Sequence, residues 1–154
     1  MSVVAAIRPD DWNLPLLLHV LGAMLLVGGL TAAVIALWLG WRGNSLTLPR
    51  LGFKSLLFVA FPAWWLMRIP GQWIASKEGF DDLQPSWIEL GYITAEAGGL
   101  LLLISLVVVG IGVRRMGRAE TPSPSVLVRI GTVLVTIVLA AYLVAVWAMS
   151  AKPD

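Results

Sequence analysis

The sequence has no cysteine and only one histidine, His19, among its 154 residues. Without cysteine the chain has no thiolate metal ligand, no nucleophilic thiol and no disulfide. A single histidine excludes a bis-histidine haem within one chain and a two-histidine zinc motif. The sequence also lacks a Gly-rich phosphate-binding motif after a strand and a G-x-S-x-G elbow. These absences leave no catalytic motif that identifies a reaction.

Charged residues are also scarce, at 13% of the chain, whereas 58% of the residues are hydrophobic. Soluble globular domains have about 25% charged residues, so this composition indicates a membrane protein. A helix needs about 20 apolar residues to cross about 30 Å of hydrocarbon. Four runs reach this length, and they cover residues 14–41, 53–74, 88–113 and 130–149. We therefore predict an all-α, polytopic membrane protein in which residues 1–154 form one domain, an antiparallel four-helix transmembrane bundle.

The positions of the basic residues predict the orientation of this bundle, because Lys and Arg near helix ends are retained on the cytoplasmic side. Seven of the eleven lie in the first and third connections, as Arg42, Arg50, Lys54, Arg114, Arg115, Arg118 and Arg129. Acidic residues lie before the first run, at Asp10 and Asp11, and around the second connection. Both termini are therefore expected outside (N-out, C-out) in a bacterial inner membrane. This topology explains the basic connections without a nucleic-acid partner.

Three ionisable residues, His19, Arg68 and Glu96, lie inside three different runs. A charge inside a bilayer costs roughly 2.5 to 3.5 kcal/mol on insertion scales, so a helix that keeps one usually supplies it with a partner or a use. At about 1.5 Å per residue, antiparallel threading brings these three residues and Tyr142 to roughly 8 to 12 Å below the outer boundary. We therefore expect an inward-facing polar cluster in the outer leaflet. In it Arg68 pairs with Glu96, and His19 and Tyr142 complete the hydrogen bonds.

The second run is expected to be irregular, because Pro62 and Pro70 each remove a backbone donor and press on the preceding turn. A bend or break is predicted there. Trp64 lies four residues before Arg68 and shares its helix face, where an indole and a cation attract each other. Residues 71–87 mix aromatic and charged side chains, which is typical of a connection lying in the outer interface.

Small residues predict where helices approach one another, because helices in lipid associate through close packing. On the first run, Gly28, Ala32, Ala36 and Gly40 recur at four-residue spacing and so share one face. We expect this stripe to contact a neighbouring helix along the cytoplasmic half of the bundle.

A short segment of the first run, Leu18-His19-Val20-Leu21-Gly22 followed by Gly28-Gly29, carries a resemblance to known membrane proteins. It resembles small four-helix bacterial proteins related to the copper-resistance protein D membrane domain and to uncharacterised predicted integral membrane families. The layout is also similar to that of the membrane-bound protoporphyrinogen oxidase, which binds haem b. The resemblance implies that His19 is a metal or haem ligand. It does not extend to an intramembrane lysine expected on the third helix of the oxidase, where this sequence has Glu96.

Three functions are compatible with these residues. In the first, the chain is a structural or accessory membrane subunit, whose partners are the lipid bilayer and other membrane subunits or further copies of itself. In the second, it is a redox protein in which His19 ligates haem b or bonds to a quinone, Arg68 neutralises a propionate, and Tyr142 and Trp64 line the pocket. In the third, His19 and Glu96 form part of a proton or small-solute pathway, although the cytoplasmic half has no ionisable residue at depth.

Overall fold

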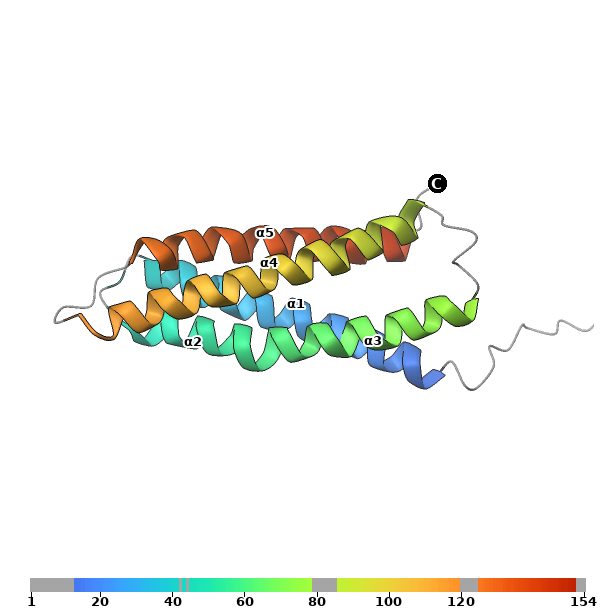
Figure 1. Ribbon diagram of the computed structural model, residues 1–154, viewed down its shortest axis with the longest axis horizontal. Coiled ribbons are helices and arrows are strands. Elements are labelled where there is room, and N and C mark those ends of the chain that lie inside the picture. Colours follow the sequence, from blue (N-terminus) through green and yellow to red (C-terminus); the bar gives the residue numbers. More distant parts are fainter. Residues whose placement is uncertain (1–12, 42, 44, 79–85, 120–124, 152–154) are drawn as a thin grey trace, which may run out of the picture.

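The computed structural model describes residues 13–41, 43, 45–78, 86–119 and 125–151, and within them the regular elements are all helices (Figure 1). They are α1 (Asn13–Trp41), α2 (Thr47–Ser55), the π-helical turn η2 (Leu56–Ala60), α3 (Phe61–Glu78), α4 (Ser86–Met116) and α5 (Val126–Ala151). Because α2, η2 and α3 follow one another without a gap, they form one continuous segment. The chain thus has helix at all four predicted runs. Asp10, Asp11, Arg42 and residues 79–85, used in the orientation prediction, lie outside the described residues.

Three of the helices are long and apolar enough to cross a membrane, namely α1, residues Gly91–Met116 of α4, and α5. The 29 residues of α1 extend over about 43 Å, at about 1.5 Å per residue, which exceeds the hydrocarbon thickness of about 30 Å. The α2–α3 segment is not among the three, and its second half carries Arg68 and Gln72. These findings indicate a multi-pass membrane protein.

The helices pack as two pairs, and glycines set the contacts in both. Along α1 and the α2–α3 segment the facing residues are Gly22 with Met67, Gly29 with Ala60, and Gly40 with Pro49. Along α4 and α5 they are Gly91 with Met149, Gly98 with Tyr142, and Gly131 with Val109. The residue numbers of each pair add to 89 in the first set and to 240 in the second. A constant sum means that the two members of each pair run in opposite directions, as can be followed in Figure 1.

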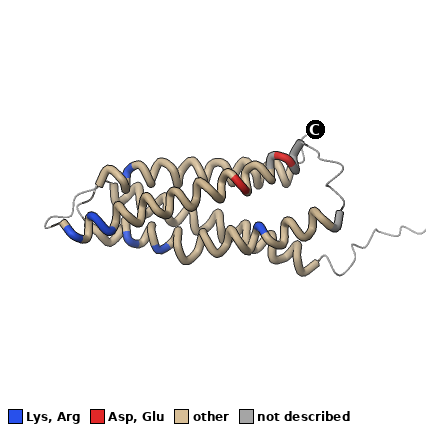
Figure 2. The backbone as a smooth tube through the Cα atoms, in the orientation of Figure 1, with Lys and Arg blue, Asp and Glu red and all other residues tan. Residues whose placement is uncertain are grey.

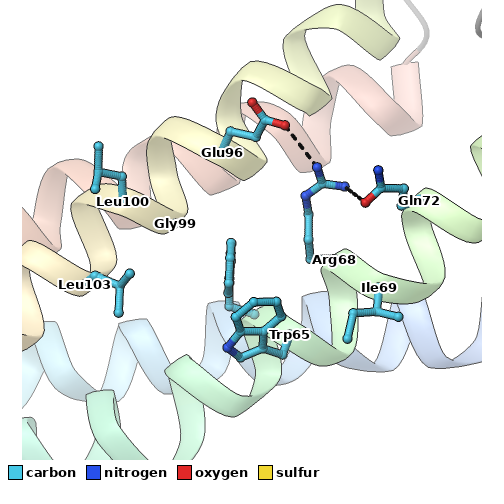
Figure 3. Close-up of a pocket in the computed structure, with 9 residues that line it drawn as sticks. Trp65, Arg68, Ile69, Gln72, Glu96, Gly99, Leu100 and Leu103 are labelled. Carbon is cyan, nitrogen blue, oxygen red and sulfur yellow. Dashed lines mark hydrogen bonds and ion pairs between the residues drawn. The ribbon is translucent and has the colours of Figure 1, made fainter.

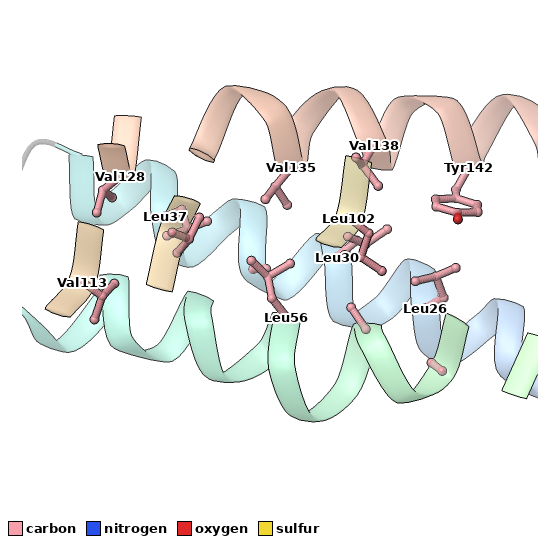
Figure 4. Close-up of a cluster of buried hydrophobic side chains, with 14 of the residues drawn as sticks. Leu26, Leu30, Leu37, Leu56, Leu102, Val113, Val128, Val135, Val138 and Tyr142 are labelled. Carbon is pink, nitrogen blue, oxygen red and sulfur yellow. The ribbon is translucent and has the colours of Figure 1, made fainter. Parts of the chain in front are cut away.

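The first helix, α1, connects the two pairs, because it packs on the α2–α3 segment and also on α5. Apolar side chains from every segment meet in the core between them (Figure 4), and they include Leu26, Leu30, Leu56, Leu102 and Val135, each 0% exposed. In contrast, α3 and α4 contact each other at only a few points. The seam between α3 and α4 is therefore more loosely packed than the contacts of α1 with α3 and of α4 with α5.

The second run is irregular at Pro62, as predicted, but a break is not present, because the helix continues through both Pro62 and Pro70 to Glu78. Directly before Pro62, the turn Leu56–Ala60 is π-helical, and the N–H of Phe61 donates to the carbonyl of Leu56. This wider turn gives room to a proline ring that would meet the carbonyl four residues earlier in a regular helix. The predicted interfacial connection also starts later than expected, because residues 71–78 belong to α3.

The predicted small-residue stripe on α1 is half correct. Ala36 and Gly40 are buried against the neighbouring segment, whereas Gly28 and Ala32 are exposed. The small residues that α1 buries are Gly22, Gly29, Ala33, Ala36 and Gly40. Near Gly28 and Ala32 the buried face of α1 is therefore rotated by about one residue from the predicted one, since Gly29 and Ala33 are buried instead.

The contact between α1 and α3 can be tested at Gly22. A Cβ there would lie 2.7 Å from the carbonyl carbon of Leu66 and against the backbone nitrogen of Met67, so Gly22→Ala would force the two helices apart. We expect a loss of about 1 to 3 kcal/mol in unfolding free energy, as overpacking causes. The measurement is reversible unfolding of the purified protein in mixed detergent micelles.

Gly28→Ala is the matched control on the same helix. Nothing lies within 4 Å of a Cβ at Gly28, and alanine favours helix over glycine by about 0.5 to 1 kcal/mol. We therefore expect this variant to be as stable as the wild type or more stable. Equal stability of the two variants would contradict the close approach of α1 and α3.

Candidate functional site

Arg68 on α3 is the centre of a polar cluster at the seam with α4 (Figure 3). Its Nη2 donates to Oε1 of Glu96 at 3.0 Å, and its Nη1 donates to Oε1 of Gln72 at 3.0 Å. The guanidinium carbon also lies 5.7 Å from the centre of the Tyr92 ring. The ion pair predicted from the sequence is thus present, and it connects α3 to α4.

The sequence predicts that the cluster faces the interior of the bundle. In the structure it does not. The side chain of Glu96 is 69% exposed, whereas that of Arg68 is 16% exposed. The carboxylate therefore lies at the outer edge of the seam, and the guanidinium reaches toward it from a more enclosed position. An ionised carboxylate facing hydrocarbon is costly, so this edge of the protein requires a polar neighbour in a membrane.

The ion pair lies in a groove of about 400 Å³ between α3 and α4 (Figure 3). The groove is lined by Trp64, Trp65, Arg68, Ile69, Gln72, Glu96, Gly99, Leu100 and Leu103. Its polar residues gather toward one end, and its remaining lining is apolar or aromatic. The site thus combines a charged end with an apolar body, which is an amphipathic arrangement.

Trp64 closes the floor of this groove by binding across to α4. Its indole Nε1–H donates to the carbonyl of Ala95 at 3.0 Å. The indole can reach this carbonyl because Gly99 has no side chain, and a Cβ there would collide with the ring. Trp65 packs edge-on against Trp64, with the ring centres 4.6 Å apart. Trp64 therefore acts as a bridge between the two helices, whose direct contacts are otherwise few.

His19 lies on the other side of α3, at its contact with α1. Its Nδ1 lies 2.8 Å from the carbonyl oxygen of Met67. A carbonyl only accepts, so the Nδ1–H of His19 donates this hydrogen bond. The ring also fills the space above Gly71, where a Cβ would lie 2.7 Å from Nδ1. His19 is therefore held in a fixed orientation by the backbone of α3.

Tyr142 on α5 lies at a third contact, between α5 and α4. It is 3% exposed, and its ring packs on Gly98. Its buried hydroxyl has no hydrogen-bond partner among the described residues. The nearby indole N–H of Trp64 donates to Ala95 instead. Tyr142 thus packs on α4 from the side of α5, and it does not form a hydrogen bond with Arg68.

The residues that the sequence assigned to a haem site are therefore distributed over three interfaces. His19 lies between α1 and α3, Arg68 and Trp64 between α3 and α4, and Tyr142 between α4 and α5. Neither His19 nor Tyr142 lines the groove that contains Arg68. Within the described part of the chain, no group of three or more metal-ligating side chains is present either. The arrangement does not fit a haem bound by His19 with Arg68 at a propionate.

Two members of the cluster, Gln72 and Tyr92, were not identified from the sequence. Gln72 lies four residues after Arg68, and Tyr92 lies four residues before Glu96, so each shares a helix face with a charged residue. This spacing could have identified both as neighbours of the ion pair.

No protein-family model, no curated protein and no solved structure matches this chain. The resemblance around His19 to the copper-resistance protein D domain therefore stays a prediction. Function is inferred from the contacts of the chain's own residues.

Loss of one member of the ion pair should destabilise the protein more than loss of both. In Glu96→Gln the Arg68 guanidinium remains, largely enclosed, without a carboxylate, whereas the double variant with Arg68→Gln removes both charges. We expect a coupling energy of about 0.5 to 2 kcal/mol in a double-mutant cycle measured by unfolding in bicelles. Glu89→Gln, an exposed carboxylate in the first turn of α4, is the control and should show no coupling to Arg68. Additive effects of the two substitutions would show that the pair does not connect α3 to α4.

Tyr142→Phe should leave stability unchanged or increase it by up to about 1 kcal/mol, because it removes a buried hydroxyl that has no partner. The ring keeps its contact with Gly98, so packing is preserved. The measurement is the same bicelle unfolding experiment. A loss of more than about 1 kcal/mol would indicate that the hydroxyl forms a hydrogen bond in the membrane.

Proposed function

We propose that this chain is an accessory subunit of the bacterial inner membrane that binds a transmembrane helix of a partner protein in the groove between α3 and α4. It crosses the membrane four times as an antiparallel bundle, with both termini outside. The observation that carries the proposal is the ion pair of Arg68 with Glu96, whose carboxylate side chain is 69% exposed on a helix apolar enough to span a membrane.

The distribution of charge supports this topology. Among the residues that Figure 2 colours, Lys and Arg lie at the end of the bundle where α1 ends and α5 begins, with Arg68 as the exception. The basic residues of this end are Arg50, Lys54, Arg114, Arg115, Arg118 and Arg129. The acidic Glu89 and Glu96 lie toward the opposite end. Because basic helix ends stay on the cytoplasmic side, this end is assigned to the cytoplasm.

The lower apolarity of the α2–α3 segment is consistent with its role as the fourth span. Arg68 and Gln72, which make it less apolar, bond to each other and to Glu96 and do not stand alone in lipid. A charge that is hydrogen-bonded within the protein costs less than an isolated one. The segment also packs along the whole length of α1, a membrane-length helix.

The groove is suited to a helix because its lining residues extend over positions 64–72 of α3 and 96–103 of α4, about two turns of each helix. Its rim consists of exposed apolar side chains, Trp65, Ile69 and Leu100, which can pack on a neighbour in lipid. Within the described residues, Glu96 accepts a bond only at Oε1, so Oε2 can accept a second one. A partner helix with one hydrogen-bond donor at this depth would satisfy the carboxylate, and intramembrane bonds of this kind contribute about 0.6 kcal/mol on average.

A second candidate function is binding of an amphipathic redox carrier of the quinone class in the same groove. Its volume of about 400 Å³ lies within the range of about 300 to 1,000 Å³ that is typical of small-molecule sites. The donors of Arg68 and Gln72 at its polar end could bind carbonyl oxygens, and Trp64 and Trp65 could pack on a ring. Quinone binding in this groove does not involve His19, which is not part of the lining.

Photocrosslinking in native membranes separates these functions. A photoreactive residue replaces Leu103, which lines the groove, or Ile137, which lies on α5 at the same depth because 103 and 137 also add to 240. Both side chains are exposed, at 39% and 51%. We expect a protein adduct of one defined mass from position 103 and only lipid adducts from position 137. Adding Glu96→Gln should reduce the adduct from position 103 without reducing the amount of protein in the membrane.

The other outcomes of this experiment are equally informative. A small lipophilic adduct from position 103 alone would replace the partner helix with the quinone-type ligand. Lipid adducts from both positions in equal amounts would contradict both functions, since the groove would then be an ordinary part of the lipid-facing surface.

A further inference from the structure

A second pocket lies at the basic end of the bundle, far along the helices from the Arg68 groove. It has a volume of about 290 Å³ and lies between the end of α1 and the start of α5. It is lined by Trp41, Arg129, Ile130, Val133 and Leu134. Arg129 is thus its only charged residue, and the rest of the lining is aromatic or aliphatic.

The residues at the mouth of this pocket are held in place by a chain of contacts. The Arg129 guanidinium lies 5.6 Å from the centre of the Trp41 ring. Trp41 stacks on Trp38, with the ring centres 4.9 Å apart and the planes at 5°. The Trp38 Nε1–H then donates to Oγ1 of Thr136 on α5 at 3.1 Å. The ring beneath the guanidinium is therefore fixed before any ligand arrives.

The charge of Arg129 is not neutralised by the described part of the protein. The single ion pair among the described residues joins Arg68 to Glu96, and the acidic residues Glu89 and Glu96 lie toward the opposite end. Arg129 also follows closely after the start of α5, where the helix dipole is positive and disfavours a cation. Both facts favour an anion next to its guanidinium.

We propose that this pocket binds an anionic phospholipid of the leaflet at the basic end of the bundle. The phosphate accepts hydrogen bonds from the planar guanidinium of Arg129, which is suited to bidentate contact. An acyl chain lies along α5 over Ile130 and Val133, which are 47% and 43% exposed. An acyl chain explains why the pocket continues below the arginine as an apolar surface, since a free phosphate ion would leave that surface uncovered.

The test is lipid retention by the full-length protein, measured by native mass spectrometry after extraction from nanodiscs that contain equal amounts of phosphatidylglycerol and phosphatidylcholine. We expect the wild type to retain phosphatidylglycerol in preference to phosphatidylcholine. Arg129→Gln should weaken this preference by about fivefold, which corresponds to the loss of one cation near an anionic lipid. Arg129→Lys, which keeps the positive charge but not the planar guanidinium, should weaken this preference by less than Arg129→Gln does.

Arg118→Gln is the matched control, because it removes one exposed positive charge from the same end without altering the pocket. It should retain phosphatidylglycerol like the wild type. An equal loss in Arg118→Gln and Arg129→Gln would overturn the proposal, because the preference would then come from the overall positive charge. Displacement of the lipid by millimolar inorganic phosphate would also overturn it in favour of a free-anion site. The proposal does not depend on the α3–α4 groove, so either can fail without the other.

Discussion

Close approach of neighbouring helices at glycines determines how this bundle is assembled. In lipid, apolar side chains gain little by burial, so helices associate where their surfaces fit at short range. Gly22, Gly29 and Gly40 allow α1 to approach the α2–α3 segment, and Gly98 and Gly131 do the same for α4 and α5. A shift of either register by one residue would bring side chains to these positions. The glycines therefore fix which residues stand level with one another, including those at the seam.

The positions of the helices and the ion pair could be predicted from the sequence because both depend on composition and order. Apolar length predicts where helices lie, and a cation and an anion in separate membrane helices have few alternatives to pairing. The direction in which residues face could not be predicted. Gly28 and Gly29 are neighbours, yet the first is exposed and the second buried. A soluble helix would reveal its inner face by polarity, but all faces of α1 are apolar, so this signal is absent.

Other contacts could not be predicted from the sequence for a different reason. His19 bonds to the backbone carbonyl of Met67 and Trp64 to that of Ala95. Every residue has a carbonyl, so the sequence gives no sign of which one accepts, and a search among polar side chains directs attention to the wrong partners. This is why His19 and Tyr142 were expected to join Arg68 and instead lie at separate interfaces.

The pocket at Arg129 and the groove at Arg68 differ in what a membrane would supply to their charged side chains. Arg129 and the other described cations of the basic end can reach water or headgroups, so the lack of an ion pair within the described part of the protein costs little, and an anionic headgroup is the natural counterion. Arg68 lies well inside α3, and it is paired within the protein because hydrocarbon offers no counterion. Its partner Glu96 reaches the surface at the seam between α3 and α4, where the exposed side chains of α4 include the apolar Ile93 and Leu100. Since lipid tails cannot solvate a carboxylate, the seam is the part of the surface that gains most from a bound partner.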